Sequence, residues 1–391
     1  MKKLIALLLT LAMVIGLVAC GGGAASSAAE APAEEKTEEA AEEPKEEEAA
    51  PAEEASEEEA AAEEEAPAEE EAPAADGDGY VIALANGYFG NAWRSQMIKT
   101  FSSYCERLKE EGVIADYVVD SCGTEADAQI NQVRNFISKG YDAIVINANS
   151  PTALIDVCEE AMERGIPVCG FDNAVASDKV YTVNISQVEF GELQMNYVCE
   201  GMGGKGNIII VRGVAGTEVD NGRYEGYMNV LEKYPDVNVV TTVTGDWDDA
   251  TTQTELTNAF NAFKGTEING IVGCTGGAGA IEAIKNAGLD PQDFYLAGDM
   301  GNLLAQLIVE EGLHAIGTNS PPYGACAAVD VCLAALHGEN PPMYTTIPCT
   351  YFTSENAADY YVEGAGDSFF CGWTDDNNTW GLKVEDVIPD K

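Results

Sequence analysis

Short hydrophobic runs alternate with amphipathic stretches from Tyr80 to near the end of the chain. Each run is four to eight residues long and rich in β-branched residues, which predicts a buried strand. Ten strands are expected, at 80–85, 117–120, 143–146, 167–171, 180–183, 207–211, 237–244, 270–273, 294–297 and 313–317.

The stretches between these runs have the period of a helix. Met97, Phe101, Cys105 and Leu108 recur every three or four residues, and Gly112 ends that helix. Strands that are hydrophobic on both faces and separated by helices indicate parallel sheets covered on both sides. Because ten such units exceed one comfortable sheet, we predict an α/β fold of two doubly wound parallel-sheet lobes.

The chain begins with two segments that lie outside this pattern. Residues 1–19 have a basic start and a hydrophobic run shorter than the roughly 20 residues that span a bilayer, which is typical of an export signal. Its end, followed by Cys20 and Gly21, resembles the lipobox of bacterial lipoproteins. The resemblance implies cleavage before Cys20 and its lipidation. An ordinary signal peptide with an incidental cysteine is the alternative.

Residues 20–79 are almost entirely Ala, Glu and Pro. Because glutamates repel one another and proline interrupts helices, we expect a disordered acidic tether that holds the folded part away from the membrane. The whole chain carries a formal net charge of −47. This charge excludes a nucleic-acid partner and disfavours binding to anionic lipid through basic patches.

The composition offers little material for catalysis or metal binding. Only two histidines are present, so a Ser-His-Asp triad or a histidine metal site is not expected, nor is any cofactor. Ten of the 11 cysteines are scattered through the region after Tyr80 without a C-x-x-C motif. We expect mostly buried free thiols; the pattern leaves open one or two disulfides.

Polar and aromatic residues follow the predicted strands, where parallel sheets bind ligands. Carboxylates and amides suit paired hydrogen bonds to hydroxyl groups, and aromatic rings suit the C–H faces of a sugar. The candidates after the strands are Asn91, Trp93, Arg94, Asn147, Asp172, Asn173, Trp247, Asp299 and Asn319.

Several of these segments together resemble the ribose- and galactose-type (type 1) periplasmic sugar-binding proteins. The matching stretches are 82–94, 143–153, 166–172, 213–217 with Arg223, 296–299 and 317–320. Each motif is weak alone, but their order and spacing match from Tyr80 to about Tyr351. Four aromatic residues beyond that point have no counterpart in the resemblance: Phe369, Phe370, Trp373 and Trp380.

The resemblance implies a solute-binding subunit of a bacterial ABC importer, lipid-anchored to the outer face of the cell membrane. It would be a monomer without enzymatic activity that binds a monosaccharide between its lobes and delivers it to a membrane permease. Three crossing segments would form the hinge. The first lobe would comprise 80–185 plus 320–348, and the second 186–319 plus 349–391.

The same resemblance assigns roles to single residues. Asn91 would be the first-loop amide, Asp172 the hinge-side acid, Asp299 the second-lobe acid and Asn319 a hinge amide, with Trp93 and Trp247 sandwiching the ring. Arg223 matches a second-lobe arginine, and Asn147 a polar residue at a strand end. Three positions depart from the ribose pattern: Arg94 replaces an aromatic residue, Asn173 replaces an arginine, and Thr275 stands near a usual asparagine. Arg94 suggests a more polar or acidic substituent on the ligand.

Two other functions fit the same pattern. A signalling receptor for a sugar-like autoinducer would use the same fold. An enzyme could use Asp172 and Asp299 as an acid/base pair on a glycoside, although no aromatic-rich extended subsite is visible in the sequence.

Overall fold

The computed structural model describes residues 79–274, 277–373 and 379–389. The predicted signal peptide, the acidic tether, Cys20 and Thr275 lie outside the described residues. Within those ranges, no helix combines the length and the apolar character needed to cross a membrane.

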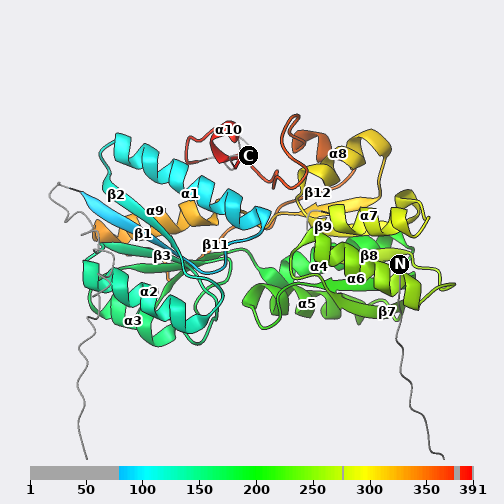
Figure 1. Ribbon diagram of the computed structural model, residues 1–391, viewed down its shortest axis with the longest axis horizontal. Coiled ribbons are helices and arrows are strands. Elements are labelled where there is room, and N and C mark those ends of the chain that lie inside the picture. The colour runs from blue at the N-terminus through cyan, green and yellow to red at the C-terminus, as the bar shows by residue number, and fades with distance from the viewer. Residues whose placement is uncertain (1–78, 275–276, 374–378, 390–391) are drawn as a thin grey trace, which may run out of the picture. The chain divides into compact units, whose positions relative to one another are not determined.

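The first lobe is a six-stranded parallel sheet covered by helices on both faces (Figure 1). α1 (Ala92–Glu110) and α9 (Gly324–Leu336) cover one face, and α2 (Ala126–Lys139) and α3 (Ile155–Glu163) cover the other. The strands, in spatial order, are β11 (Tyr344–Thr346), β5 (Tyr181–Asn184), β4 (Val168–Phe171), β3 (Ala143–Asn147), β1 (Tyr80–Asn86) and β2 (Ile114–Ser121).

The second lobe repeats this arrangement. α4 (Gln187–Gly201) and α5 (Glu218–Leu231) cover one face, and α6 (Asp249–Ala262), α7 (Ala278–Asn286) and α8 (Asn302–Glu311) cover the other. β12 runs antiparallel to its neighbour, β10, and the other strand pairs described in this sheet are parallel. The strands, in spatial order, are β12 (Tyr351–Phe352), β10 (Ala315–Thr318), β9 (Tyr295–Asp299), β8 (Gly270–Cys274), β6 (Lys205–Arg212) and β7 (Asp236–Thr244).

The structure confirms the ten strands predicted from hydrophobic runs and the two doubly wound sheets. β11 and β12 were not predicted, because they are only three and two residues long and are mostly exposed or half-buried. The chain passes from one sheet to the other after β5, after β10 and between β11 and β12, which confirms the three-segment hinge.

The C-terminal segment differs from the expected division into lobes. The prediction places 349–391 wholly in the second lobe, but Trp380 Nε1 donates to Asp330 Oδ2 of α9 at 2.7 Å, and α10 (Val384–Val387) packs against α1 (Figure 1). Asp330 is the one charged residue of α9, and it is exposed on the surface of that helix. Its carboxylate accepts hydrogen bonds from Trp380 and from Tyr104 of α1, so the C-terminal segment and α1 meet at this residue.

The cysteines behave as small core residues. All nine whose side chains the structure describes are unpaired, and seven of them are buried. Burial raises the pKa of the Cys158 thiol to about 12, so this thiol stays protonated. The prediction of mostly buried free thiols is thus confirmed for these nine.

The sheet topology decides where a ligand can enter. In the first sheet the strand order reverses between β1 and β3, and in the second between β6 and β8. Crevices form outside the carboxyl ends of strands at such reversals.

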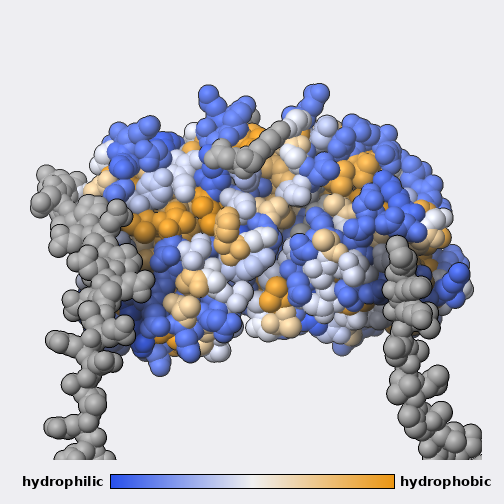
Figure 2. Space-filling model, viewed as in Figure 1, coloured by the Kyte–Doolittle hydropathy of each residue, from blue (hydrophilic) through white to orange (hydrophobic). Residues whose placement is uncertain are grey.

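The view in Figure 2 shows mostly hydrophilic outer helix faces, with hydrophobic residues gathered over β1 and α9.

Candidate ligand-binding site

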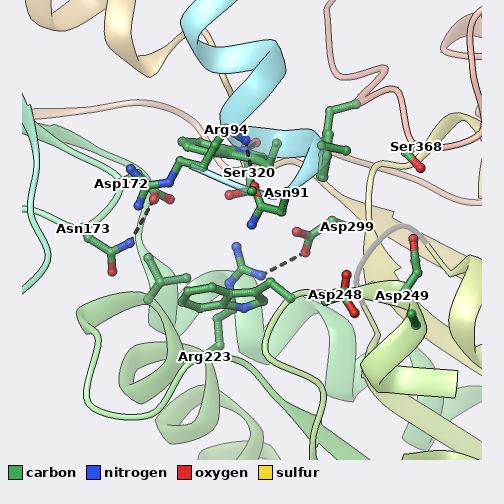
Figure 3. A pocket seen from close by; sticks show the side chains of 17 residues that line it. Asn91, Arg94, Asp172, Asn173, Arg223, Asp248, Asp249, Asp299, Ser320 and Ser368 are labelled. Carbon is green, nitrogen blue, oxygen red and sulfur yellow. Dashed lines mark hydrogen bonds and ion pairs between the residues drawn. The ribbon is translucent and has the colours of Figure 1, made fainter. Parts of the chain in front are cut away.

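A cavity of about 350 Å³ lies between the carboxyl ends of the two sheets. Figure 3 shows Arg94, Asp172 and Asn173 at one end of it and Asp248, Asp249 and Ser368 at the other. The ion pair between Arg223 and Asp299 lies between these ends. The lining residues are Gly90, Asn91, Ala92, Trp93, Arg94, Asp172, Asn173, Val219, Arg223, Trp247, Asp248, Asp249, Ala250, Asp299, Ser320, Ser368 and Phe370.

The start of α1 supplies the first group of lining residues. Asn91 is the N-cap of α1, and its Oδ1 accepts from the backbone N–H of Arg94 at 2.9 Å. Trp93 Nε1 donates to the backbone oxygen of Ser320 at 2.8 Å, which ties α1 to the crossing segment after β10. The cap and this hydrogen bond fix both side chains at the cavity wall.

Arg94 is buried beside Trp93, with its guanidinium carbon 5.6 Å from the Trp93 ring centroid. Its Nη1 donates to Asn86 Oδ1 at 2.7 Å. Burial lowers the pKa of Arg94, and the negative charge of Asp172 opposes that shift. The guanidinium therefore already has partners, which weakens the idea that it requires an acidic substituent on the ligand.

Asp172 stands directly after β4 in a left-handed conformation, with φ of 55°. Its Oδ2 accepts from Asn147 Nδ2 and from Asn173 Nδ2, each at 3.1 Å. The backbone oxygen of Asp172 accepts from Asn184 Nδ2 at 2.7 Å, which holds the strained turn. Burial raises the pKa of Asp172, whereas Arg94 and the hydrogen bond from Asn147 oppose the rise.

Arg223 and Asp299 form a buried ion pair, with Nη1 and Oδ1 2.9 Å apart. Arg223 Nε donates to Gln187 Oε1 at 3.2 Å, and its guanidinium carbon lies 3.7 Å from the ring centroid of Phe190. Burial raises the pKa of Asp299, and Arg223 opposes that shift. The pair thus presents a carboxylate and a guanidinium together at the cavity.

The loop after β7 carries Trp247 on a strained backbone. Asp246 and Trp247 have φ values of 52° and 54°, in a region that non-glycine residues rarely adopt. Gly213 makes room for the Trp247 indole, because a methyl group at Gly213 would overlap the ring. Asp248 caps α6 by accepting from the backbone N–H of Thr251 at 2.8 Å.

We expect Gly213→Ala to weaken ligand binding, although residue 213 itself does not contact the ligand. The added methyl group displaces the Trp247 indole, and losing an aromatic contact worth about 1–1.5 kcal/mol lowers affinity roughly tenfold. Calorimetric titration measures the ligand affinity of this variant and of a control, Val214→Ala, which changes an exposed neighbouring residue. Equal affinities in the two variants would contradict the proposed placement of the indole.

The comparisons with known proteins agree with this geometry. The family model described as a periplasmic binding protein domain matches residues 82–340. The chain belongs to the periplasmic binding protein family. The resemblance read from the sequence is therefore confirmed at the level of the family and of its fold.

Individual relatives are similar to parts of this binding protein in sequence or in structure. The xylitol-binding protein of Mycolicibacterium smegmatis is 31% identical over 133 residues, which span 34% of this chain and 38% of that relative. The ribose import binding protein RbsB of Bacillus subtilis is 24% identical over 262 residues, spanning 66% of this chain and 83% of the relative. An ABC transporter solute binding protein from Thermobispora bispora superposes with a TM-score of 0.69 at 28% identity, covering 74% and 90% of the two chains.

The structure brings eight of the eleven residues predicted for the binding protein's site to the cavity. They are Asn91, Trp93, Arg94, Asp172, Asn173, Arg223, Trp247 and Asp299. Asn147 lies behind Asp172 and orients it. Asn319 lies in the hinge, where its Nδ2 donates to Tyr323 Oη at 3.0 Å and to Thr350 Oγ1 at 3.1 Å. Thr275 is outside the described residues.

Sequence reasoning missed nine lining residues. Asp248 was visible beside Trp247 at a strand end, and Ser320 lay within a matching segment, so a signal existed for both. Ser368 and Phe370 gave none, because they come from the C-terminal segment beyond the resemblance. Among the described residues, no group of three His, Cys, Asp or Glu side chains is arranged to hold a metal ion.

Proposed function

We propose that this protein is the extracytoplasmic receptor of an ABC importer and that it traps one neutral monosaccharide between its lobes. The observation that carries the proposal is the cavity itself, which combines two tryptophans with two carboxyl groups, Asp172 and the ion-paired Asp299. Asp172 and Asp299 would accept hydrogen bonds from paired hydroxyl groups, and Trp93 and Trp247 would pack against the C–H faces. The names of the two relatives, a ribose import binding protein and a xylitol-binding protein, support a small, neutral, polyhydroxylated ligand of this kind.

The size of the cavity favours a single sugar. Ligand sites commonly range from about 300 to 1,000 Å³, and this one, at about 350 Å³, is near the lower limit. A polymer would need an open path past the site, whereas these lining residues come from both lobes and from the C-terminal segment. This supports a receptor for a small solute over a glycoside-acting enzyme built on Asp172 and Asp299.

The charges at the cavity favour a neutral sugar over a sugar acid. Arg94 and Arg223 bring two positive charges, whereas Asp172, Asp248, Asp249 and Asp299 bring four carboxyl groups. A ligand carboxylate would meet this surplus of negative charge in a partly desolvated space, which costs free energy.

The mechanism we propose is hinge closure around the sugar. Asn91, Trp93 and Asp172 belong to the first lobe, and Arg223 and Trp247 to the second, so neither lobe holds a complete site. The open form would bind through one lobe, and closure would add the contacts of the other. The permease would then recognise the closed form.

A thermal-shift screen of the detergent-solubilised full chain tests this function. The panel contains neutral pentoses and hexoses, the matching hexuronic acids, nucleosides and a furanosyl autoinducer. A ligand that binds only the folded state raises the melting temperature. We expect a shift of several degrees with a neutral monosaccharide and none with its uronic acid. A shift with the acid alone, or conversion of the sugar to a product, would refute the proposal.

We further propose that Cys20 carries the lipid anchor and that residues 20–79 are the tether. Cys20→Ser should move most of the protein from the membrane fraction to the soluble fraction and abolish labelling with a radioactive fatty acid. Cys122→Ser, which changes a half-buried thiol of the folded part, should leave both properties unchanged. A membrane-bound, labelled Cys20→Ser protein would contradict the anchor.

A further inference from the structure

We propose that Phe370 determines which sugars fit the cavity and that Gln96 positions it by clamping the C-terminal segment across the two lobes. The inference rests on the proposed function, because it concerns the same cavity. Phe370 and Ser368 line this cavity although they lie outside the matched family region of 82–340.

The second lobe holds one side of this segment through backbone hydrogen bonds. The N–H of Asn302 donates to the backbone oxygen of Phe369 at 2.8 Å, and the N–H of Cys371 donates to that of Met300 at 2.9 Å. Phe370 also forms an isolated antiparallel bridge with Gly301. The segment therefore runs beside the turn between β9 and α8, next to Asp299.

The first lobe holds the same residue from the other side. Gln96 of α1 is 2% exposed, and its Nε2 donates to the backbone oxygen of Phe370 at 2.9 Å. Its Oε1 accepts from the backbone N–H of Phe370 at 2.8 Å. Both polar groups of the Gln96 carboxamide thus bind the backbone of Phe370, and Phe370 is held by both lobes at once.

The chain then continues onto the first lobe, where it is anchored again. Trp380 donates to Asp330 of α9, and Ser103 Oγ of α1 donates to the backbone oxygen of Asp386 at 2.7 Å. Trp373 and Trp380 pack on Tyr323, with ring centroids 5.6 and 5.2 Å from that of Tyr323. The chain therefore passes between the lobes a fourth time, beside the cavity.

This placement makes the segment one wall of the site. In Figure 3, Ser368 lies at the end of the cavity that also holds Asp248 and Asp249, away from Arg94 and Asp172. A sugar held by its hydroxyl groups at Asp172 and Asp299 would direct a further substituent toward this wall. Because Phe370 is itself clamped and cannot easily move aside, it limits the size of that substituent.

The test compares Phe370→Ala with Phe369→Ala in the full chain. Phe369 is an adjacent phenylalanine, also 4% exposed, but it does not line the cavity. Calorimetry measures the affinities of D-ribose, D-xylose, L-arabinose and D-galactose and of their mono-O-methyl ethers. We expect Phe370→Ala to weaken the best-bound parent sugar at least tenfold and to raise the ratio of ether to parent affinity at least tenfold. Phe369→Ala should change that ratio less than threefold.

Gln96→Met tests the positioning role by a readout independent of the sugar. It removes both hydrogen bonds to Phe370, so we expect the Phe370 amide to exchange with deuterium at least tenfold faster in the ligand-free protein. The ether-to-parent ratio should move in the same direction as in Phe370→Ala. Unchanged exchange at Phe370 would overturn the clamp.

The remaining outcomes separate this inference from the proposed function. If the wild type binds a parent sugar and the two phenylalanine variants change all affinities by one common factor, the specificity role of Phe370 is wrong while the proposed function stands. If the wild type binds none of the neutral pentoses and hexoses of the thermal-shift panel, the proposed function and the specificity role are both overturned.

Discussion

Arg223→Met is expected to destabilise the ligand-free protein by about 3–5 kcal/mol at neutral pH, because removing one partner of a buried ion pair leaves the other charge uncompensated. Asp299, the partner, is only 6% exposed. Sugar binding should also be lost, since the guanidinium lines the cavity. Denaturant unfolding measures the loss of stability.

The pH dependence of this loss follows from Asp299. Burial already raises its pKa above the usual value, and Arg223 opposes that shift. A carboxyl group with a raised pKa stabilises the fold below its unfolded pKa and loses that contribution as the pH rises through its folded pKa. Without Arg223 the pKa rises further, so the penalty of Arg223→Met should shrink as the pH falls.

Two further variants control this prediction. Arg164→Met breaks an exposed ion pair with Glu160 outside the cavity, and it should cost less. The double variant Arg223→Met with Asp299→Asn removes the stranded charge and should recover much of the stability. A penalty for Arg223→Met that is below about 1 kcal/mol, as for exposed pairs, and independent of pH would contradict this account of the pair.

Asp172→Asn is expected to weaken sugar binding roughly ten- to hundredfold while making the ligand-free protein more stable at neutral pH. Hydrogen bonds to a charged group contribute about 1.5–3 kcal/mol, which corresponds to that loss of affinity. Asparagine also tolerates the left-handed backbone that Asp172 adopts, so the turn is preserved.

The gain in stability follows from the raised pKa of Asp172, which burial causes and which the attraction of Arg94 does not cancel. The ionised carboxylate therefore lowers the stability of the empty site. Below the usual pKa of 3.8 the group is neutral in both states, so variant and wild type should be equally stable there. The difference should grow as the pH rises to neutral, which unfolding at several pH values measures. A variant less stable than the wild type at neutral pH would contradict the account.

The fold could be predicted because the spacing of hydrophobic residues along the chain directly reflects which positions are buried. The runs at β1, β3, β4 and β9 are buried along nearly their whole length, so their pattern alone identified them. β12 could not be found this way. It has only two residues, and its pairing with β10 depends on the hinge rather than on its own pattern.

The site could be predicted where a residue directly follows a strand. Asp172 and Asp299 stand at strand ends, and the topology places both at the cavity. Asn147 and Asn319 also stand at strand ends, but their side-chain amides donate hydrogen bonds within the protein, to Asp172 and to a residue of the hinge. Which polar groups find partners inside the protein depends on tertiary packing, and sequence position does not reveal it.

The role of Gln96 could not be predicted for the same reason. It is a polar residue within a helix, and its partner Phe370 lies 274 residues further along the chain. The C-terminal aromatic residues had no visible role in the sequence. Their role depends on the fourth passage of the chain between the lobes, and the spacing of hydrophobic residues does not reveal that passage.

The most direct test of the central claim is a calorimetric titration of the full chain with the neutral monosaccharide that raises its melting temperature most. The account predicts one binding site per chain, recovery of the sugar unchanged, and loss of most of the affinity in Asp172→Asn. Binding that is unaffected by this substitution, or consumption of the sugar during the titration, would contradict a receptor that traps a sugar in this cavity.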